Sequence, residues 1–373
     1  DSCCSFPGRR GLRIAQLVPL ATPAYLLAAT LIELGSRLSW RVHGIGWALA
    51  VLTLCTYSYV FLLSTESFAG AGRRPLEACL SLGVGAWGSF RRVALPMALP
   101  AIAAGIALSG MEVVNELGAV DLLGVPTLSV GILQRWQSEG NPRGATALAL
   151  MALLIVTLLV AAERWQRRRS RRWSLVGKGE TLPPWPLQGW RVLTAQTLMT
   201  LPPLASLGLP LLWVGLSWGQ LQAESASELG GLALRSFFLA LLASLLTVAM
   251  GVLLAVARRW LPQPLVRRLS FLAGMGYAIP GTVLALGLML IGGPAGLSPL
   301  LLLVWGYGDR FLAVAKGGLD AGLEQLPPSL DEAATSLGCD WLQVLRRVHL
   351  PLLRGPLVVG GLLVFVDTVK ELA

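Results

Sequence analysis

The chain has 373 residues, of which 54% are hydrophobic and only 13% charged, with a formal net charge of +10. Its charges lie between apolar stretches of about 20 residues, a pattern that is typical of a polytopic membrane protein and excludes one large soluble core. The same distribution argues against nucleic acid as the partner of the positive charge, because the basic residues cluster between apolar spans. Five cysteines show no metal or disulfide spacing, so we expect reduced thiols.

Four membrane spans are predicted in the first half of the chain. They cover roughly residues 14–34, 46–64, 98–117 and 145–162, and the last stops at the basic run ERWQRRRSRRW. Residues 173–198, rich in Pro, Trp and Gly, are predicted to be a connector. This places the first half at residues 1–172 and the second half at residues 199–373.

The second half adds five predicted spans, near 200–219, 233–257, 269–292, 299–316 and from about 356 onward. If the N-terminus lies inside and the chain alternates sides, most of the 30 Lys and Arg residues fall on the cytoplasmic side. That bias follows the positive-inside rule. The predicted fold is therefore all-α, a polytopic transmembrane helical bundle with about nine spans.

A duplicated segment organises the chain. Residues 77–118 and 332–373 align without a gap at an offset of 255, with 15 identities in 42 pairs. Six predicted spans separate the two copies, so they lie on the same side of the membrane in two parallel, pseudo-symmetric repeats. The register also predicts six spans for a complete half, so we expect the first half here to lack its first spans and the second half its last span.

Each copy of the segment is predicted to form a short helix, a break and a second helix. Asp331 and Glu332 fall in the first turn, where negative charge is favourable. Gly338 stands where a left-handed residue would end the helix, and Pro351 opens the next span. Such an element is too polar to cross a bilayer and too apolar to stand alone, so we expect it to contact a soluble cytoplasmic partner.

The spacing within this segment resembles a known signature. Glu-Ala-Ala, three residues, Gly, nine residues, an aliphatic residue, one residue and Leu-Pro is similar to the EAA loop of permeases in binding-protein-dependent ABC importers. Residues 332–351 match it fully, and residues 77–96 depart only at Cys79. Two such loops in one chain, with the runs LATPAYLLA, YAIPGTVLALGL, RFLAVA and DTVKELA, resemble the fused permeases of the ferric-iron importer type.

The resemblance implies a multi-pass permease subunit in the bacterial inner membrane. It implies a periplasmic binding protein that delivers ferric iron and a cytoplasmic ATPase dimer that binds the ATP, so this chain itself needs no cofactor. The chain indeed shows no phosphate-binding loop, no nucleophile–base pair and no metal-ligating cluster, so we expect no catalysis and no metal site in it. Coupling to the ATPase is implied for the residues at the motif positions: Glu77, Ala78, Gly83, Leu95, Pro96, Glu332, Ala333, Ala334, Gly338, Leu350 and Pro351.

Carboxylates within the spans form a second candidate site. Glu112 and Glu116 lie one helical turn apart, and their register partners are Asp367 and Glu371. One interpretation is a translocation pathway, in which hard oxygen ligands face a trivalent cation across the pseudo-twofold axis. The other is structural, with two of the carboxylates near the outer interface and Lys370 paired with a neighbouring acid.

Two further predictions concern packing within the spans. Asp309 and Arg310 are predicted to form a structural ion pair. Gly105 and Gly360 coincide in the repeat and are predicted to let the two central helices approach closely.

Other functions remain open on the sequence alone. Permeases of similar build import thiamine, phosphonates or polyamines, and the loop signature does not separate these cargoes from iron. An ion-gradient-driven transporter or a channel would have no reason to repeat a cytoplasmic loop, and co-purification of an ATPase would discriminate against both. An inactive permease remnant is a third alternative, which uptake assays would test.

Overall fold

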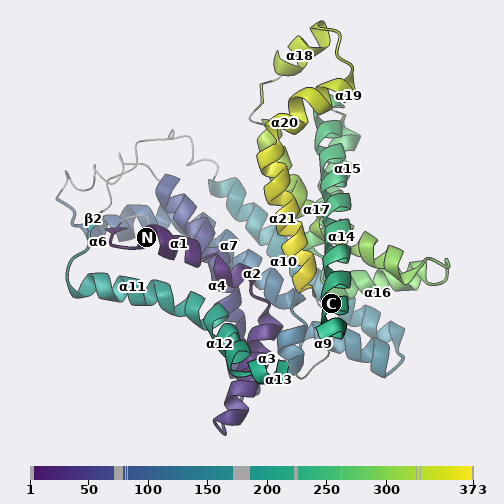
Figure 1. The fold of residues 1–373 in the computed structure, drawn as a ribbon. Coiled ribbons are helices and arrows are strands. Elements are labelled where there is room, and N and C mark those ends of the chain that lie inside the picture. The colour runs from purple at the N-terminus through teal and green to yellow at the C-terminus, as the bar shows by residue number, and fades with distance from the viewer. Residues whose placement is uncertain are drawn as a thin grey trace. The chain divides into compact units, whose positions relative to one another are not determined.

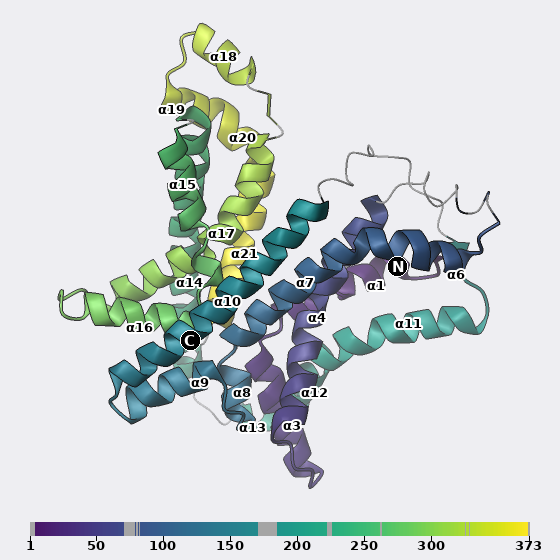
Figure 2. The same ribbon diagram turned by 180° about the vertical axis from the view of Figure 1, so that it is seen from behind.

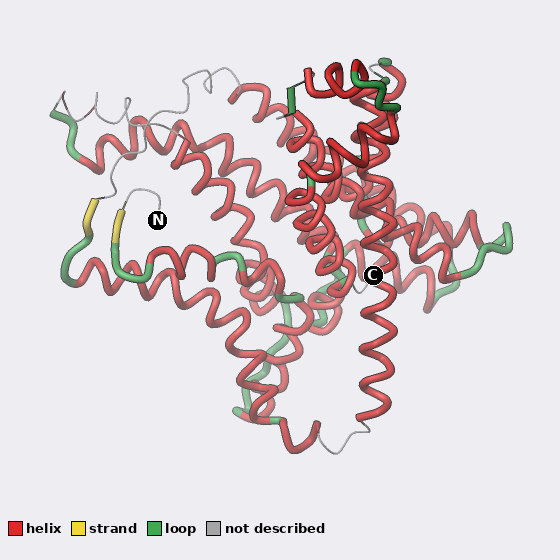
Figure 3. Tube along the Cα trace, turned by 45° about the horizontal axis from the view of Figure 1, so that its top comes forward, coloured by secondary structure: helices red, strands yellow, loops and turns green. Residues whose placement is uncertain are grey.

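The structure, a computed structural model, describes residues 4–70, 79, 81, 83–170, 185–221, 226–261, 263–324, 326–327 and 329–371. Within these ranges almost everything outside short turns is helical (Figure 3), which confirms the predicted all-α class. The only strands in the described ranges are β1 (Cys4–Ser5) and β2 (Trp185–Pro186), which form a two-residue parallel pair. Packing divides the chain into two units, Asp1–Gly219 and Gln220–Ala373.

The first unit is built around α4 and α7, which pack along each other, with α10 packed against the other side of α7 (Figure 2). Three π-helical turns interrupt its helices: η1 (Phe90–Ala94), η2 (Gln134–Ser138) and η3 (Leu204–Gly208). Its α-helices are α1 (Arg9–Ala15), α2 (Val18–Ala21), α3 (Ala24–Arg37), α4 (Ile45–Gly70), α6 (Ala86–Ser89), α7 (Leu95–Asn115), α8 (Gly118–Leu122), α9 (Leu128–Leu133), α10 (Pro142–Ser170), α11 (Trp190–Pro203) and α12 (Leu209–Leu216), with α13 (Trp218–Leu221) at the boundary.

A core between α3, α4 and α8 holds this unit together. Leu27, Val51 and Leu123 are fully buried there. The span formed by α11, η3 and α12 packs against α1, α2 and α3, so by packing it belongs to the first unit. The sequence analysis assigns residues from 199 onward to the second half. That division concerns the repeat and not the packing, and it stays a prediction.

The second unit is built around α14, α17 and α21, which pack on one another (Figure 1). Its other helices and turns are shorter. Ser244 Oγ on α14 donates to the carbonyl of Gly361 on α21 over 2.7 Å, the kind of contact that joins helices in lipid. The elements are α14 (Ala226–Trp260), α15 (Pro264–Ala273), the 3-10 turn η4 (Gly276–Ala278), α16 (Gly281–Gly292), α17 (Pro299–Glu324), α18 (Ser329–Ser336), α19 (Trp341–Val344), the π-helical turn η5 (Leu345–His349), α20 (Leu350–Leu352) and α21 (Arg354–Lys370).

The described residues contain five helices long and apolar enough to cross a membrane, or up to seven if each of two bent helix pairs is one span. Two of the nine predicted spans do not satisfy these criteria. The span predicted at 269–292 is divided into α15, η4 and the 12-residue α16. The span predicted at 299–316 is a long helix, α17, but it carries Asp309, Arg310 and Lys316.

The two glycines of the repeat pack inside their own units. A Cβ at Gly105 on α7 would lie 2.6 Å from Cα of Val60 on α4. A Cβ at Gly360 on α21 would lie 3.5 Å from Cα of Ala315 on α17, at the equivalent register position. The glycines therefore serve contacts between neighbouring helices of one unit, whereas the sequence suggested contacts between the two central helices.

Candidate functional site

The duplicated segments are here called loop 1, residues 74–97, and loop 2, residues 329–352. In loop 2, α18 ends at Ser336, and Gly338 just after it has a left-handed φ of 82°. The Cys339 N–H donates to the carbonyl of Ala334 over 3.0 Å, and the Gly338 N–H donates to that of Thr335 over 2.9 Å. This pair of bonds is a Schellman motif, which satisfies the last carbonyls of a helix and favours glycine at this position.

Loop 1 repeats this geometry as far as it is described. Gly83 has a φ of 77°, and the Val84 N–H donates to the carbonyl of Cys79 over 3.0 Å, at the register positions of the bond in loop 2. The predicted left-handed conformation is therefore confirmed at both glycines. The π-helical turns also coincide, because η1 and η5 lie 255 residues apart.

The two loops enter their spans differently. Trp87–Asn115 forms one span of 29 residues, in which loop 1 continues into α7. In loop 2 the chain bends by 76° between Trp341–Leu352 and Arg354–Lys370. Pro356 lies in the first turn of α21, where it has no N–H to bond back to the preceding turn, and Gly355 lowers the cost of the break.

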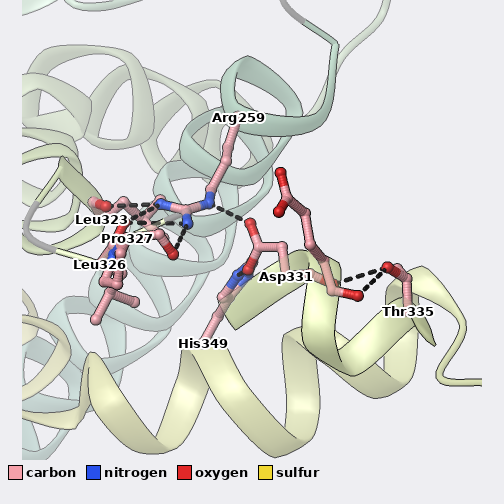
Figure 4. A network of polar contacts seen from close by, with 8 residues as sticks. Arg259, Leu323, Leu326, Pro327, Asp331, Thr335 and His349 are labelled. Atoms are coloured by element: carbon pink, nitrogen blue, oxygen red, sulfur yellow. Dashed lines mark hydrogen bonds and ion pairs between the residues drawn. The ribbon is translucent and has the colours of Figure 1, made fainter. Parts of the chain in front are cut away.

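A buried polar cluster fixes loop 2. The carboxylate of Asp331, in the first turn of α18, lies between the side chains of Arg259 and His349 (Figure 4). Its Oδ2 accepts from Nε of Arg259 at 2.5 Å, and its Oδ1 lies 2.8 Å from Nε2 of His349. His349 is fully buried on η5, and Arg259 is at the end of α14. The three side chains join both helices of loop 2 to α14.

The guanidinium of Arg259 also closes the end of α17. It donates to the carbonyls of Leu323, Leu326 and Pro327, at distances between 2.7 and 3.4 Å (Figure 4). Leu323 lies in the last turn of α17, and Leu326 and Pro327 follow the end of that helix. Hydrogen bonds to a charged group contribute about 1.5–3 kcal/mol each when they are shielded from water, so Arg259 is a substantial anchor. We call Arg259, Asp331 and His349 the loop 2 joint.

The charge state of Asp331 follows from these neighbours. Burial alone would raise the pKa of its carboxyl group, but the hydrogen bonds and charges of Arg259 and His349 outweigh burial and hold that pKa below its ordinary value of 3.8. Asp331 is therefore ionised at neutral pH. A carboxylate can only accept hydrogen bonds, so Nε2 of His349 carries the proton between them.

A second ion cluster joins Arg258, the residue before Arg259 on α14, to α17. Nη1 of Arg258 lies 3.0 Å from Oδ2 of Asp320, and Nζ of Lys316 lies 2.7 Å from the same oxygen. Asp320 and Lys316 belong to α17, so these contacts connect α14 and α17.

Loop 1 is held by aromatic rings. Phe90 on η1 stacks on Trp87 with 5.5 Å between ring centroids, and it contacts Phe68 on α4 at 6.0 Å. Such ring pairs contribute about 0.5–1.5 kcal/mol beyond the area that they bury. The ring of Trp87 itself is 70% exposed.

The predicted coupling residues divide by exposure. Glu332, Ala333, Gly338, Pro96 and Pro351 are exposed. Gly83 is exposed as well, Leu95 and Leu350 are partly buried, and Ala334 is buried against the fold; Glu77 and Ala78 lie outside the described residues. The roles of all of them in coupling stay predictions.

Exposed apolar side chains on the loops were missed by the sequence reasoning. Leu337 is 84% exposed and Trp341 57% exposed, and both flank the turn at Gly338 in loop 2. Trp87 occupies a similar place in loop 1. Large apolar side chains gathered on a solvent-facing turn are typical of a protein interface. The sequence did contain a signal for these side chains, because Trp87 and Trp341 each lie just after the motif glycine.

The predicted pathway carboxylates are mostly engaged within their units. Oε2 of Glu371 lies 3.1 Å from Nη2 of Arg310, so that arginine pairs with Glu371 and the predicted pairing with Asp309 is wrong. Lys370 pairs with Asp367 over 3.0 Å, as the structural interpretation expected.

In the first unit, Oε1 of Glu116 accepts from the Ala119 N–H over 2.9 Å and so caps α8. Glu112 is partly buried on α7. Among the residues that the structure describes, no three His, Cys, Asp or Glu side chains come together as a metal site. A pathway role for these carboxylates stays a prediction.

The chain belongs to the family of binding-protein-dependent transport system inner membrane components. The family model matches residues 5–173 and 247–373, which include both loops. It is thus a multi-pass inner membrane protein, the permease of a binding-protein-dependent ABC transporter.

Several curated proteins are similar to it. The Fe(3+)-transport system permease protein FbpB 2 of Haemophilus influenzae is 27% identical over 98% of this chain and 73% of its own length. The molybdenum transport system permease protein ModB of Escherichia coli is 26% identical over 45% of this chain and 81% of its own. A probable sulfate transport system permease protein cysT of Nephroselmis olivacea is 30% identical over 45% of this chain and 64% of its own length. No solved structure matched the chain significantly.

Proposed function

We propose that this permease imports ferric iron, delivered by a periplasmic binding protein and driven by a separate cytoplasmic ATPase dimer. The observation that carries the coupling to a motor is the duplicated loop. Both copies have a left-handed glycine and, ahead of the next helix, a π-helical turn, at the same register positions. Two matching elements in one chain suit two equivalent subunits of a motor.

Docking of the ATPase would use the exposed apolar side chains of the loops. Leu337 and Trp341 in loop 2, and Trp87 in loop 1, are large apolar groups that a soluble partner could cover. ATP binding and hydrolysis belong to that partner in this proposal, and the motion of the loops would alternate access to the two sides of the membrane.

Iron as the cargo is supported by one relative. The protein whose printed name concerns Fe(3+) aligns with 98% of this chain, whereas those named for molybdenum and sulfate align with 45%. The loops themselves carry no information on cargo, because they contact the motor.

The cargo is tested by co-expressing the chain with the ATPase and binding protein of the same transport system, and by measuring uptake of radioactive ferric iron, molybdate and sulfate into proteoliposomes. We expect uptake of iron alone. Uptake of either oxyanion in its place would overturn the iron assignment, and uptake without ATP would overturn the ABC mechanism.

The coupling role of the loops is tested by Gly338→Leu. A side chain at a φ of 82° is strained, so the turn should change shape. We expect loss of substrate-stimulated ATP hydrolysis with normal membrane insertion. Gly317→Leu is the control, since Gly317 is exposed on α17 and a Cβ there meets nothing within 4 Å. Normal uptake by Gly338→Leu would contradict the coupling role.

The pathway carboxylates are tested by neutralising Glu112 and Asp367 together. If they line the cargo's route, uptake falls while the ATPase still co-purifies. Unchanged uptake kinetics would leave both residues with the structural role alone.

A further inference from the structure

We propose that the two loops transmit the motor's movement by different routes: loop 2 through a polar joint to α14 and α17, and loop 1 directly along α7. This inference rests on the proposed function, because it assumes that the loops bind an ATPase. It assigns Arg259, Asp331 and His349 as positioning residues of coupling, a role that the loop signature does not include.

The first argument is the connectivity of the joint. Asp331 is held on one side by Arg259 and on the other by His349, which come from α14 and from the second helix of loop 2. Both side chains of the Arg259–Asp331 pair are less than one-fifth exposed, and His349 is fully buried. A displacement of α18 therefore has to move the end of α14 or break buried hydrogen bonds.

Arg259 extends the same connection to a third helix. Its guanidinium donates to carbonyls at the end of α17 and to the carboxylate of Asp331 at the same time. The planar guanidinium presents five donors in a fixed geometry, so these bonds hold both partners at a set angle. Loop 2 is thus clamped to two helices, α14 and α17, that are distinct from α21, into which it leads.

The second argument is the bend. The 76° change of direction between Trp341–Leu352 and Arg354–Lys370 means that loop 2 is not coaxial with α21. A push on α18 or α19 along their own axes would be absorbed at Leu353 instead of travelling along α21. The joint supplies the rigid connection that the bend removes.

The third argument is the difference from loop 1. The register positions of Asp331 and His349 are occupied by Leu76 and Ala94, which have no polar side-chain atoms. Loop 1 instead continues without a comparable bend into α7, and its ring contacts join Phe90 to α4. The same movement at the two loops would therefore enter the two units through different helices.

The test uses the full chain, reconstituted with its ATPase and binding protein, with ferric iron as the transported probe. For Asp331→Asn we expect at least a tenfold loss of iron uptake per ATP hydrolysed, while the ATPase still co-purifies. Asp320→Asn is the matched control, because Asp320 pairs with the neighbouring Arg258 at the same helix ends. The iron uptake per ATP hydrolysed by Asp320→Asn should stay within about twofold of that of the unchanged protein.

A second pair of variants separates positioning from folding. His349→Gln keeps an N–H that can donate to Asp331, whereas His349→Ala removes it. We expect the glutamine variant to retain coupling within about threefold and the alanine variant to lose it. These variants decide the question if Asp331→Asn does not insert into the membrane.

Loop 1 is tested by Phe90→Leu, which introduces the residue that loop 2 carries at that register position. It should lower coupling at least threefold, because leucine cannot make the ring contacts of Phe90.

Three results would overturn the proposal: normal coupling in Asp331→Asn, an equal loss in Asp320→Asn, or equal behaviour of the two His349 variants. Normal coupling in Phe90→Leu would refute the part of the proposal that concerns loop 1. Failure of the unchanged chain to bind any ATPase would instead refute the proposed function.

Discussion

The equivalent glycines Gly105 and Gly360 should respond in opposite ways to the same substitution. In Gly105→Ala the added carbon would lie 2.6 Å from Cα and 3.1 Å from N of Val60, where ordinary contacts begin near 3.4 Å. Because these are backbone atoms, no rotamer change relieves the contact, and α4 and α7 must separate by nearly 1 Å. In Gly360→Ala the nearest atoms lie at 3.5 Å, which is ordinary contact distance.

The expected magnitudes follow from this geometry. Both substitutions gain about 1 kcal/mol from the higher helix propensity of alanine. Only Gly105→Ala also carries the cost of overpacking, about 1–3 kcal/mol. We therefore expect Gly105→Ala to lie about 1–3 kcal/mol below Gly360→Ala in its free energy of unfolding.

The assay is SDS titration of each purified variant in mixed micelles, followed by circular dichroism. A third variant sharpens it: adding Val60→Ala to Gly105→Ala should not restore stability, since the contact is with the backbone of Val60 and not with its side chain. Rescue by Val60→Ala, or equal stability of the two alanine variants, would refute the reasoning.

Three other predictions concern topology, the buried ion pair and pH. With Cys3 and Cys4 replaced, a membrane-impermeant maleimide should label Cys79 and Cys339 from the same, cytoplasmic side; labelling from opposite sides would contradict the parallel repeat. Glu371→Gln should cost about 3–5 kcal/mol by leaving the charge of Arg310 buried and unpaired, and Arg310→Met added to it should recover most of this loss in the same SDS titration. If uptake also recovers in the double variant, Glu371 does not line the pathway. 

For pH, the lowered pKa of Asp331 means that its contribution to stability is complete above pH 3.8 and is lost only as the pH falls through the lower pKa of the folded state. The free energy of unfolding from the same SDS titration, measured against pH with Asp331→Asn as reference, would contradict this if the two proteins were equally stable at pH 7 and differed only in acid.

The loops were the most predictable part of the molecule, because their signals are local. A helix that ends in glycine requires only a few consecutive residues, so the left-handed conformation of Gly83 and Gly338 could be anticipated from each copy alone, and the repeat reinforced it. Asp331 was also placed correctly in a first helical turn. The all-α class followed from apolar stretches of the length that a bilayer requires.

The loop 2 joint could not be anticipated, because its partners are distant in the sequence. Arg259 and Asp331 are 72 residues apart, and no motif links a basic residue at the end of one span to an acid in a later loop. His349 stood alone in the sequence, without the neighbours that would suggest a cluster. The pairing of Arg310 with Glu371 was missed for the same reason, since local proximity favoured Asp309 instead.

The π-helical turns have a consequence for the history of the chain. A π-helical turn accommodates one extra residue within a helix while the faces on either side keep their orientation. Because η1 and η5 occupy the same place in both copies, we infer that this extra residue was already present in a single ancestral half before the gene duplicated. Around it the two copies now differ, because loop 2 is followed by a bend of 76° and loop 1 continues into one span.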